Sequence, residues 1–225
     1  GRGLGRTYME YFVAVKPSGV AKWLNPELTS EQIAATTTRT AVLERNFAQF
    51  QFYPVNDATD MAQVLREVGF AVTLRTNATH KEMEQVIQQF GLDIRRGGVG
   101  FFFFSGHGVQ SRGGNYLIPI GANIQSEADL KFQSVDAGWV LAQMEDARNR
   151  VNIVVLDACR NNPYTRAFRS AARGLAQMDA AKGSFLAFAT APGDVAADGT
   201  GRNGTYTKHL LASLRQPESD IFQVF

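Results

Sequence analysis

Short apolar runs of strand length alternate along the chain with stretches whose apolar residues recur at helical spacing. The runs at 70–74, 99–104, 151–156 and 184–190 contain no charged residue. The run at 151–156 is rich in β-branched residues, which is typical of a strand that is buried on both faces in the middle of a parallel sheet. The pattern therefore predicts a sheet with buried central strands.

Helical periodicity occupies the intervals between the first of these runs. Asn56 and Asp57 can cap a helix whose apolar positions 61, 64, 65 and 68 share one face, and Gly69 ends it. Thr79 and Glu82 form a capping box ahead of apolar positions 83, 86, 87 and 90. Glycines at 91, 97 and 98 then lead into the next strand. Strand, helix and strand alternate, as in a parallel sheet with crossover helices.

The second half of the chain continues this alternation. A hairpin is predicted from 109–110 and 115–118 with a turn at 111–114, and helices are predicted at 135–147 and 205–214. Residues 160–183 form a long polar and alanine-rich connection, and 192–204 a glycine-rich loop. Residues 221–225 resemble the start of another helix. The expected fold class is a three-layer α/β/α arrangement with a mainly parallel central sheet.

The first 52 residues are the least readable part of the sequence. Residues 11–15 favour a strand, whereas 30–50 contain helix-like stretches around three consecutive threonines that suit a helix interior poorly. We therefore separate an N-terminal segment, 1–52, from one folded domain at 53–225.

Composition narrows the function classes. The net charge of +2 is nearly balanced and gives no argument for nucleic acid or a membrane surface as partner. No apolar run approaches the length of a membrane span, and the first residues lack the pattern of a signal peptide. The compartment stays undecided between the cytoplasm and, if a signal peptide has been removed, the periplasm or the exterior. One cysteine cannot form an intrachain disulfide.

The single cysteine, Cys159, follows the apolar run at 151–156. Ligands and catalytic groups gather beyond the carboxyl ends of parallel strands, so this thiol is either a nucleophile or a buried structural cysteine. A catalytic thiol needs an imidazole partner. His107, flanked by glycines, follows the run at 99–104 and is expected at an equivalent strand end. His80 and His209 lie in helical stretches and are expected to be solvated or packed.

The sequence around the thiol, Asp157-Ala-Cys-Arg-Asn161, is similar to the Gln-Ala-Cys-Arg-Gly of caspases, whose histidine lies about 50 residues upstream. His107 lies 52 residues before Cys159. Together with the Ser-Gly-His-Gly motif, this segment resembles caspase-like cysteine peptidases of the bacterial metacaspase or orthocaspase type over about residues 54–214. The resemblance implies the caspase-hemoglobinase-like α/β/α fold. Aspartate in place of glutamine, and asparagine in place of glycine, point toward the metacaspase branch.

One element that this family usually has is missing from its expected place. Relatives begin with a strand of alanine, valine, isoleucine and glycine type just before the segment that corresponds to 54–58. Either 11–15 supplies that strand, with an insertion after it, or the N-terminal segment is structured differently.

The resemblance implies acyl transfer, with Cys159 as nucleophile and His107 as the proton donor to the leaving amine. The backbone N–H groups of Gly108 and Cys159 are the expected oxyanion donors, and Gly108 matches the family's donor position. The substrates would be proteins or peptides. The alternative, from another class, is a catalytically inactive caspase-fold module that binds basic peptides.

Substrate preference follows from charge. Asp157 stands where aspartate-cutting caspases have a glutamine, so it would repel an acid and attract a guanidinium or ammonium group. By resemblance to metacaspases, Asp57 and Ser105 line the same pocket, although Pro54 stands where those enzymes often have a cysteine. No arginine lies at 52–58. We therefore expect cleavage after Arg or Lys.

Other interpretations have weaker support. Gly106-His-Gly108 suggests a dinucleotide site only weakly, because Ser111 stands where a third glycine belongs and no helix is predicted directly after it. Metal-ligand spacing is not evident, and no cofactor is expected to be required. Ca²⁺ activation is allowed by analogy, since many metacaspases need it. The connection at 160–183 carries Arg166, Arg169, Arg173 and Lys182, so self-cleavage there is an expectation beside that of an ordinary solvated loop. The oligomeric state is not indicated.

Overall fold

The computed structural model describes residues 8–15, 39–46, 53–159, 175–180, 183–189, 201–216 and 224. Its strands are β1 (Tyr8–Val15), β2 (Arg39–Asn46), β3 (Ala71–Arg75), β4 (Val99–Ser111), β5 (Gly114–Leu117), β6 (Val135–Asp136), β7 (Val151–Cys159) and β8 (Ser184–Phe188). Its helices are α3 (Tyr53–Glu67), α4 (His80–Ile94), the 3₁₀ turn η1 (Glu127–Asp129), α5 (Leu130–Gln133), α6 (Ala137–Ala147) and α7 (Thr205–Leu214).

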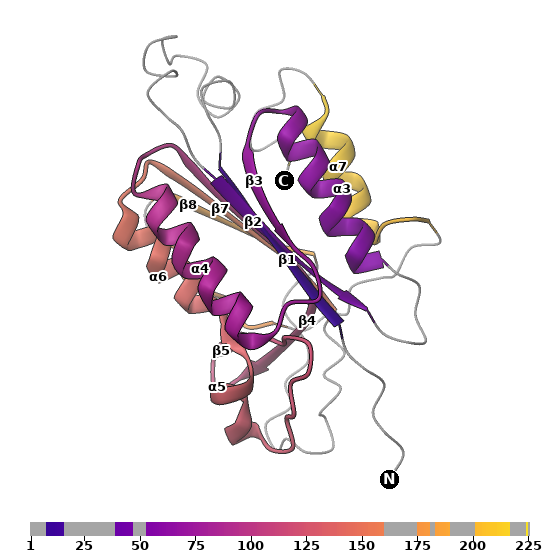
Figure 1. The fold of residues 1–225 in the computed structure, drawn as a ribbon, viewed down its shortest axis with the longest axis vertical. Coiled ribbons are helices and arrows are strands. Elements are labelled where there is room, and N and C mark those ends of the chain that lie inside the picture. Colours follow the sequence, from indigo (N-terminus) through magenta and orange to yellow (C-terminus); the bar gives the residue numbers. More distant parts are fainter. Residues whose placement is uncertain are drawn as a thin grey trace.

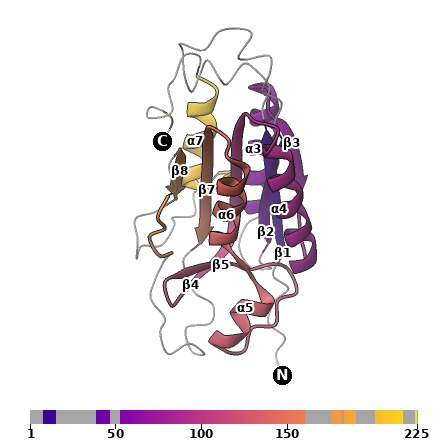
Figure 2. The ribbon, with the colours of Figure 1, turned by 90° about the vertical axis from the view of Figure 1, so that its left-hand side faces the viewer.

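The sheet is mixed but mainly parallel. β3, β2, β4, β7 and β8 run parallel to one another in that spatial order, and β1 pairs antiparallel with its neighbours. Helices α4 and α6 cover one face of the sheet, and α3 and α7 cover the other (Figure 1). Figure 2, turned by 90°, looks onto the face of the sheet that α4 and α6 cover. The predicted three-layer α/β/α fold is confirmed.

The core is built on both faces of β4. Phe101 to Phe104 are four consecutive buried phenylalanines, and because side chains alternate along a strand they divide between the two faces. Phe102 and Phe104 pack in the α4 and α6 layer, whereas Phe101 and Phe103 pack in the α3 and α7 layer. This explains why the sequence shows an unbroken apolar run rather than alternation of apolar and polar residues.

The predicted helices are present, with differences at their ends. The capping box of α4 forms as expected: Thr79 N donates to Glu82 Oε2 over 2.8 Å, and Glu82 N donates to Thr79 Oγ1 over 3.4 Å. Gly91, however, lies inside α4 rather than after it. The expectation that Asp57 caps α3 is wrong, because this helix begins at Tyr53 and Asp57 lies in its second turn. Its carboxylate is therefore available for another role.

The predicted hairpin is confirmed, but β4 is longer than the sequence suggested. It continues past Phe104 to Ser111, so His107 lies within a strand rather than after its end. The first part of β4 pairs with β7 as far as Cys159, and the last part pairs antiparallel with β5. Arg112 and Gly113 form the turn with φ values of 49° and 82°.

The N-terminal segment contributes two strands. The strand expected at 11–15 lies within β1, but the helix-like interpretation of 30–50 is wrong at 39–46, where β2 runs parallel to β4. β2 is the strand that precedes α3, which the sequence did not reveal. Of the connection at 160–183 the structure describes only 175–180 and 183, so the four basic residues of the self-cleavage expectation lie outside the described residues. The same holds for most of 192–204 and of 221–225, where Val224 alone is described, as helical.

None of the helices in the described part of the chain is long and apolar enough to cross a membrane.

Candidate active site

Two neighbouring strands bring the motif residues together. In the parallel pairing of β4 with β7, His107 lies opposite Cys159, Gly106 opposite Ala158 and Ser105 opposite Asp157. The register is held by nine consecutive pairs, which begin at Val99 and Val151. Residues that are 52 positions apart in the sequence are thus neighbours, as the two strand-end motifs predicted.

The backbone around His107 is tightly enclosed. The His107 side chain is buried, and its carbonyl accepts a hydrogen bond from Ile118 N over 3.0 Å. A Cβ atom added at Gly108 would lie 2.8 Å from Leu175 Cδ2 and 3.1 Å from Ala158 Cβ. Gly108 is therefore needed for close packing, not for an unusual backbone conformation.

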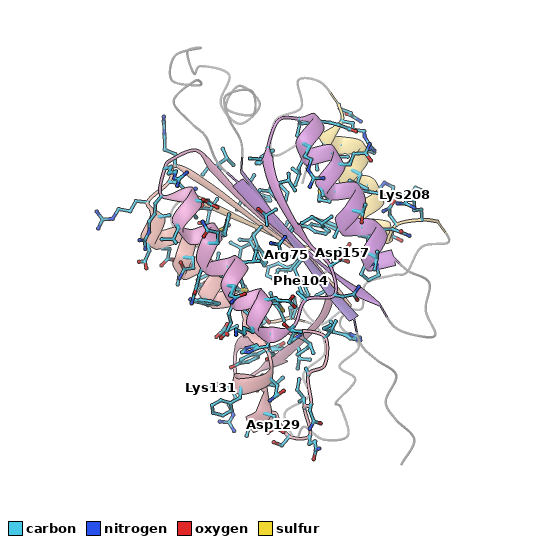
Figure 3. The ribbon with its side chains drawn as sticks, viewed as in Figure 1. Arg75, Phe104, Asp129, Lys131, Asp157 and Lys208 are labelled. Carbon is cyan, nitrogen blue, oxygen red and sulfur yellow. The ribbon has the colours of Figure 1, made fainter. Side chains whose placement is uncertain are left out.

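The residues predicted to line a pocket form a buried acidic cluster two residues before the His107–Cys159 pair. Asp57, from α3, and Asp157, from β7, are both buried, although they come from elements 100 residues apart. Ser105 Oγ donates to Asp57 Oδ2 over 3.4 Å. Figure 3 shows Asp157 between the sheet and the first turns of α3. The structure thus brings the three predicted pocket residues together.

The start of α7 also contacts this acidic cluster, which sequence reasoning missed. Gly204 N donates to Asp57 Oδ1 over 3.0 Å, and Thr207 Oγ1 donates to Asp157 Oδ2 over 2.5 Å. A Cβ atom at Gly204 would lie 3.2 Å from Asp57 Oδ2 and 3.6 Å from Asp157 Oδ2, so the glycine sits between the two carboxylates. The available signal was that Gly204 directly precedes a predicted helix, whose first N–H groups favour negative charge.

The two carboxylates influence each other. Burial raises the pKa of Asp57 well above its ordinary value, and the negative charge of Asp157 raises this pKa further. Hydrogen bonds from Asn203, Gly204 and Ser105 act in the opposite direction without overcoming these effects. The hydrogen-bond donors named here are neutral groups, so they do not balance two negative charges.

A set of hydrogen bonds joins α3 to the residues just before α7. The Arg202 guanidinium makes a two-pronged ion pair with Asp60, Nε to Oδ2 at 2.8 Å and Nη2 to Oδ1 at 2.9 Å. Asn203 Nδ2 donates to Asp60 Oδ2 over 2.9 Å, and Asn56 Nδ2 donates to the Arg202 carbonyl over 3.0 Å. We call Asn56, Asp60, Arg202 and Asn203 the clasp.

The other candidates are not part of this site. His80 Nε2 lies 3.2 Å from the Ser134 carbonyl, and His209 is exposed on α7. The segment after His107 continues as a strand, so the glycine-bounded histidine does not open a helix as a dinucleotide motif would. Within the described ranges, no three or more His, Cys, Asp or Glu side chains are grouped to hold a metal ion.

Comparison with known proteins agrees with this geometry. A family model described as the caspase domain matches residues 46–225. The mucosa-associated lymphoid tissue lymphoma translocation protein 1 of Homo sapiens is 28% identical over 114 residues, which are 49% of this chain and 13% of the human protein. Its Mus musculus homolog is 26% identical over 147 residues, 62% of this chain and 17% of the mouse protein. The chain spans less than a fifth of the length of these two relatives.

Proposed function

Because this chain belongs to the caspase-domain family, which suggests a cysteine peptidase, we propose that it is an endopeptidase that cleaves proteins or peptides after arginine or lysine. The observation that carries the proposal is the register of β4 and β7, which pairs His107 with Cys159 and, two residues earlier, Ser105 with Asp157. The proposed reacting pair and two of the three proposed pocket residues thus lie on the same two strands, and α3 adds Asp57.

In the proposed reaction, the Cys159 thiolate attacks the carbonyl carbon of the scissile bond. The C–N bond breaks as the His107 imidazolium gives a proton to the departing amine. His107 then takes a proton from a water molecule, whose oxygen attacks the thioester, and cleavage of the C–S bond restores the thiolate. Backbone N–H groups of Gly108 and Cys159 are the proposed donors to the oxyanion.

The acidic pocket supports the choice of a basic residue at the cleaved position. Bringing Asp57 and Asp157 together in a buried site is unfavourable without a counter-charge, as the raised pKa of Asp57 indicates. A guanidinium or ammonium group would neutralise this repulsion and donate hydrogen bonds to both carboxylates. An acidic side chain would instead add a third negative charge.

The finer assignment stays part of this proposal. Aspartate rather than glutamine at 157 supports the metacaspase or orthocaspase branch. Self-cleavage in the basic connection after Cys159, and activation by Ca²⁺, are further expectations. Wild-type protein that is active on peptides but stays a single band after incubation would exclude self-cleavage under those conditions.

Covalent labelling tests the proposed chemistry. A peptide with arginine attached to a thiol-reactive chloromethyl ketone should add one equivalent of mass to the wild-type protein, at Cys159. The His107→Ala variant should react much more slowly, and Cys159→Ala not at all, while both keep the wild-type thermal transition. A folded wild-type protein that binds the parent peptide but is neither labelled nor able to hydrolyse it would instead be the inactive, peptide-binding module.

A further inference from the structure

Two ion pairs connect α3 to the segment that carries α7, one in the middle of α3 and one at its end. Asp60 and Arg202 form the first, beside the acidic pocket, with 18% and 61% of their side-chain surfaces exposed. Glu67 and Arg215 form the second, at the end of both helices, over 3.5 Å and with 46% and 50% exposed. Both pairs join an arginine to a carboxylate, but the first is two-pronged and only the first is continuous with the pocket residues.

That continuity consists of successive contacts along three neighbouring residues. Arg202 is held through its side chain by Asp60 and through its carbonyl by Asn56. Asn203 also donates to Asp60. The next residue, Gly204, donates its N–H to Asp57. Each of the three residues before α7 is therefore tied to α3, and the last of them reaches a pocket carboxylate.

We propose that Asp60 and Arg202 are positioning residues for recognition of the basic side chain, an inference that rests on the proposed function and deepens it. They fix Gly204 in the space between the two pocket carboxylates, where even a Cβ atom would lie within 3.6 Å of both. Thr207, three residues later, is carried on the same helix and donates to Asp157. Breaking the Asp60–Arg202 contacts would move both the Gly204 N–H and the Thr207 hydroxyl, and so remove a donor from each carboxylate.

The expected effect that identifies positioning is on substrate binding. The half-exposed Glu67–Arg215 pair should contribute little to stability, whereas the two-pronged pair of the less exposed Asp60 should contribute more, so KM is measured where every variant is folded. A displaced Gly204 would change the surroundings of the two carboxylates that we propose bind the guanidinium group. The functional consequence should therefore appear in KM and leave the reacting thiol unaffected.

The test compares the two ion pairs in the full chain. Asp60→Asn and Arg202→Gln should each raise KM for an arginyl fluorogenic peptide by about tenfold, the loss of about one hydrogen bond, with kcat nearly unchanged. Glu67→Gln and Arg215→Gln are the matched controls and should leave KM within about twofold of wild type, a change of under 0.5 kcal/mol. The double variant of Asp60 and Arg202 should be no worse than either single one, because both break the same contact.

Two further readouts separate positioning from general damage. The rate at which iodoacetamide, a small uncharged reagent, alkylates Cys159 should be unchanged in all variants. Exchanging the charges, with Asp60→Arg and Arg202→Asp together, should bring KM part of the way back from the raised value toward that of the wild type. If the variants of the two ion pairs had equal KM values, the inference would be overturned while the proposed function stayed in place. A wild-type protein that neither cleaves nor binds arginyl peptides would overturn both.

Discussion

The ladder between β4 and β7 has two parts that share one geometry and differ in chemistry. Its first six pairs, from Val99 and Val151 to Phe104 and Leu156, are mostly buried apolar residues. Its last three pairs bring in Ser105, His107 and Asp157, which are equally buried but polar. The polar residues of the candidate site thus occupy buried strand positions, like those that carry mostly apolar side chains in the first six pairs. Burial of polar groups is unfavourable by itself, and the packing of the rest of the sheet offsets it.

The largest expected effect is loss of the reacting pair. Cys159→Ala and His107→Ala should each lower kcat/KM for arginyl peptides by about a thousandfold or more, because the two act as a unit. The thermal transition should stay close to that of the wild type. Turnover by Cys159→Ala at close to the wild-type rate would show that another group is the nucleophile.

A substitution in the apolar part of the ladder should lower stability and leave substrate preference unchanged. Phe103 is fully buried in the α3 and α7 layer, so Phe103→Ala should destabilise the fold by about 3–5 kcal/mol in equilibrium urea unfolding. At a temperature where the variant is still folded, its preference between arginyl and aspartyl peptides should match wild type. A changed preference would mean that the two parts are not separable.

Removing the charge of Asp157 should damage recognition. Asp157→Asn keeps an acceptor for Thr207 but loses a charge-assisted bond to substrate, worth about 1.5–3 kcal/mol. We expect kcat/KM for arginyl and lysyl peptides to fall by about 10- to 100-fold. Aspartyl peptides should gain little, because the substitution adds no cation. Full activity of this variant on arginyl peptides would remove Asp157 from the pocket.

Asp57→Asn should have the smallest effect on cleavage among these variants, and it should raise stability rather than lower it. Burial and Asp157 raise its pKa in the folded protein, so its contribution to stability is full below the unfolded pKa and is lost as pH rises through the folded pKa. Asp57→Asn should therefore unfold at higher urea than wild type near neutral pH, with the difference vanishing in acid. KM for arginyl peptides should rise several-fold in this variant. In the wild type, KM should also increase on acidification as Asp57 takes up a proton, and this increase should be absent from the variant. A variant less stable than wild type at neutral pH would contradict this account.

Much of the site was predictable because its residues follow recognisable strands. The apolar runs before His107 and Cys159 indicated neighbouring parallel strands, and the charge of Asp157 indicated the type of pocket. The register itself, and the extension of β4 beyond His107, depend on pairing with β7 and β5, which local periodicity does not encode. Gly204 and Arg202 contact α3 residues that lie about 145 positions earlier in the sequence, which local patterns do not reveal. β2 was missed because three charged residues, Arg39, Glu44 and Arg45, leave only a short apolar run at 41–43.

The most direct test of the central claim is a panel of fluorogenic peptides that differ only in the cleaved residue, Arg, Lys or Asp, with and without Ca²⁺. Cys159→Ala serves as the blank. The two buried carboxylates beside the His107–Cys159 pair predict cleavage after Arg and Lys and essentially none after Asp, a difference of several powers of ten. Efficient cleavage after Asp by the wild-type protein would contradict the assignment of the pocket.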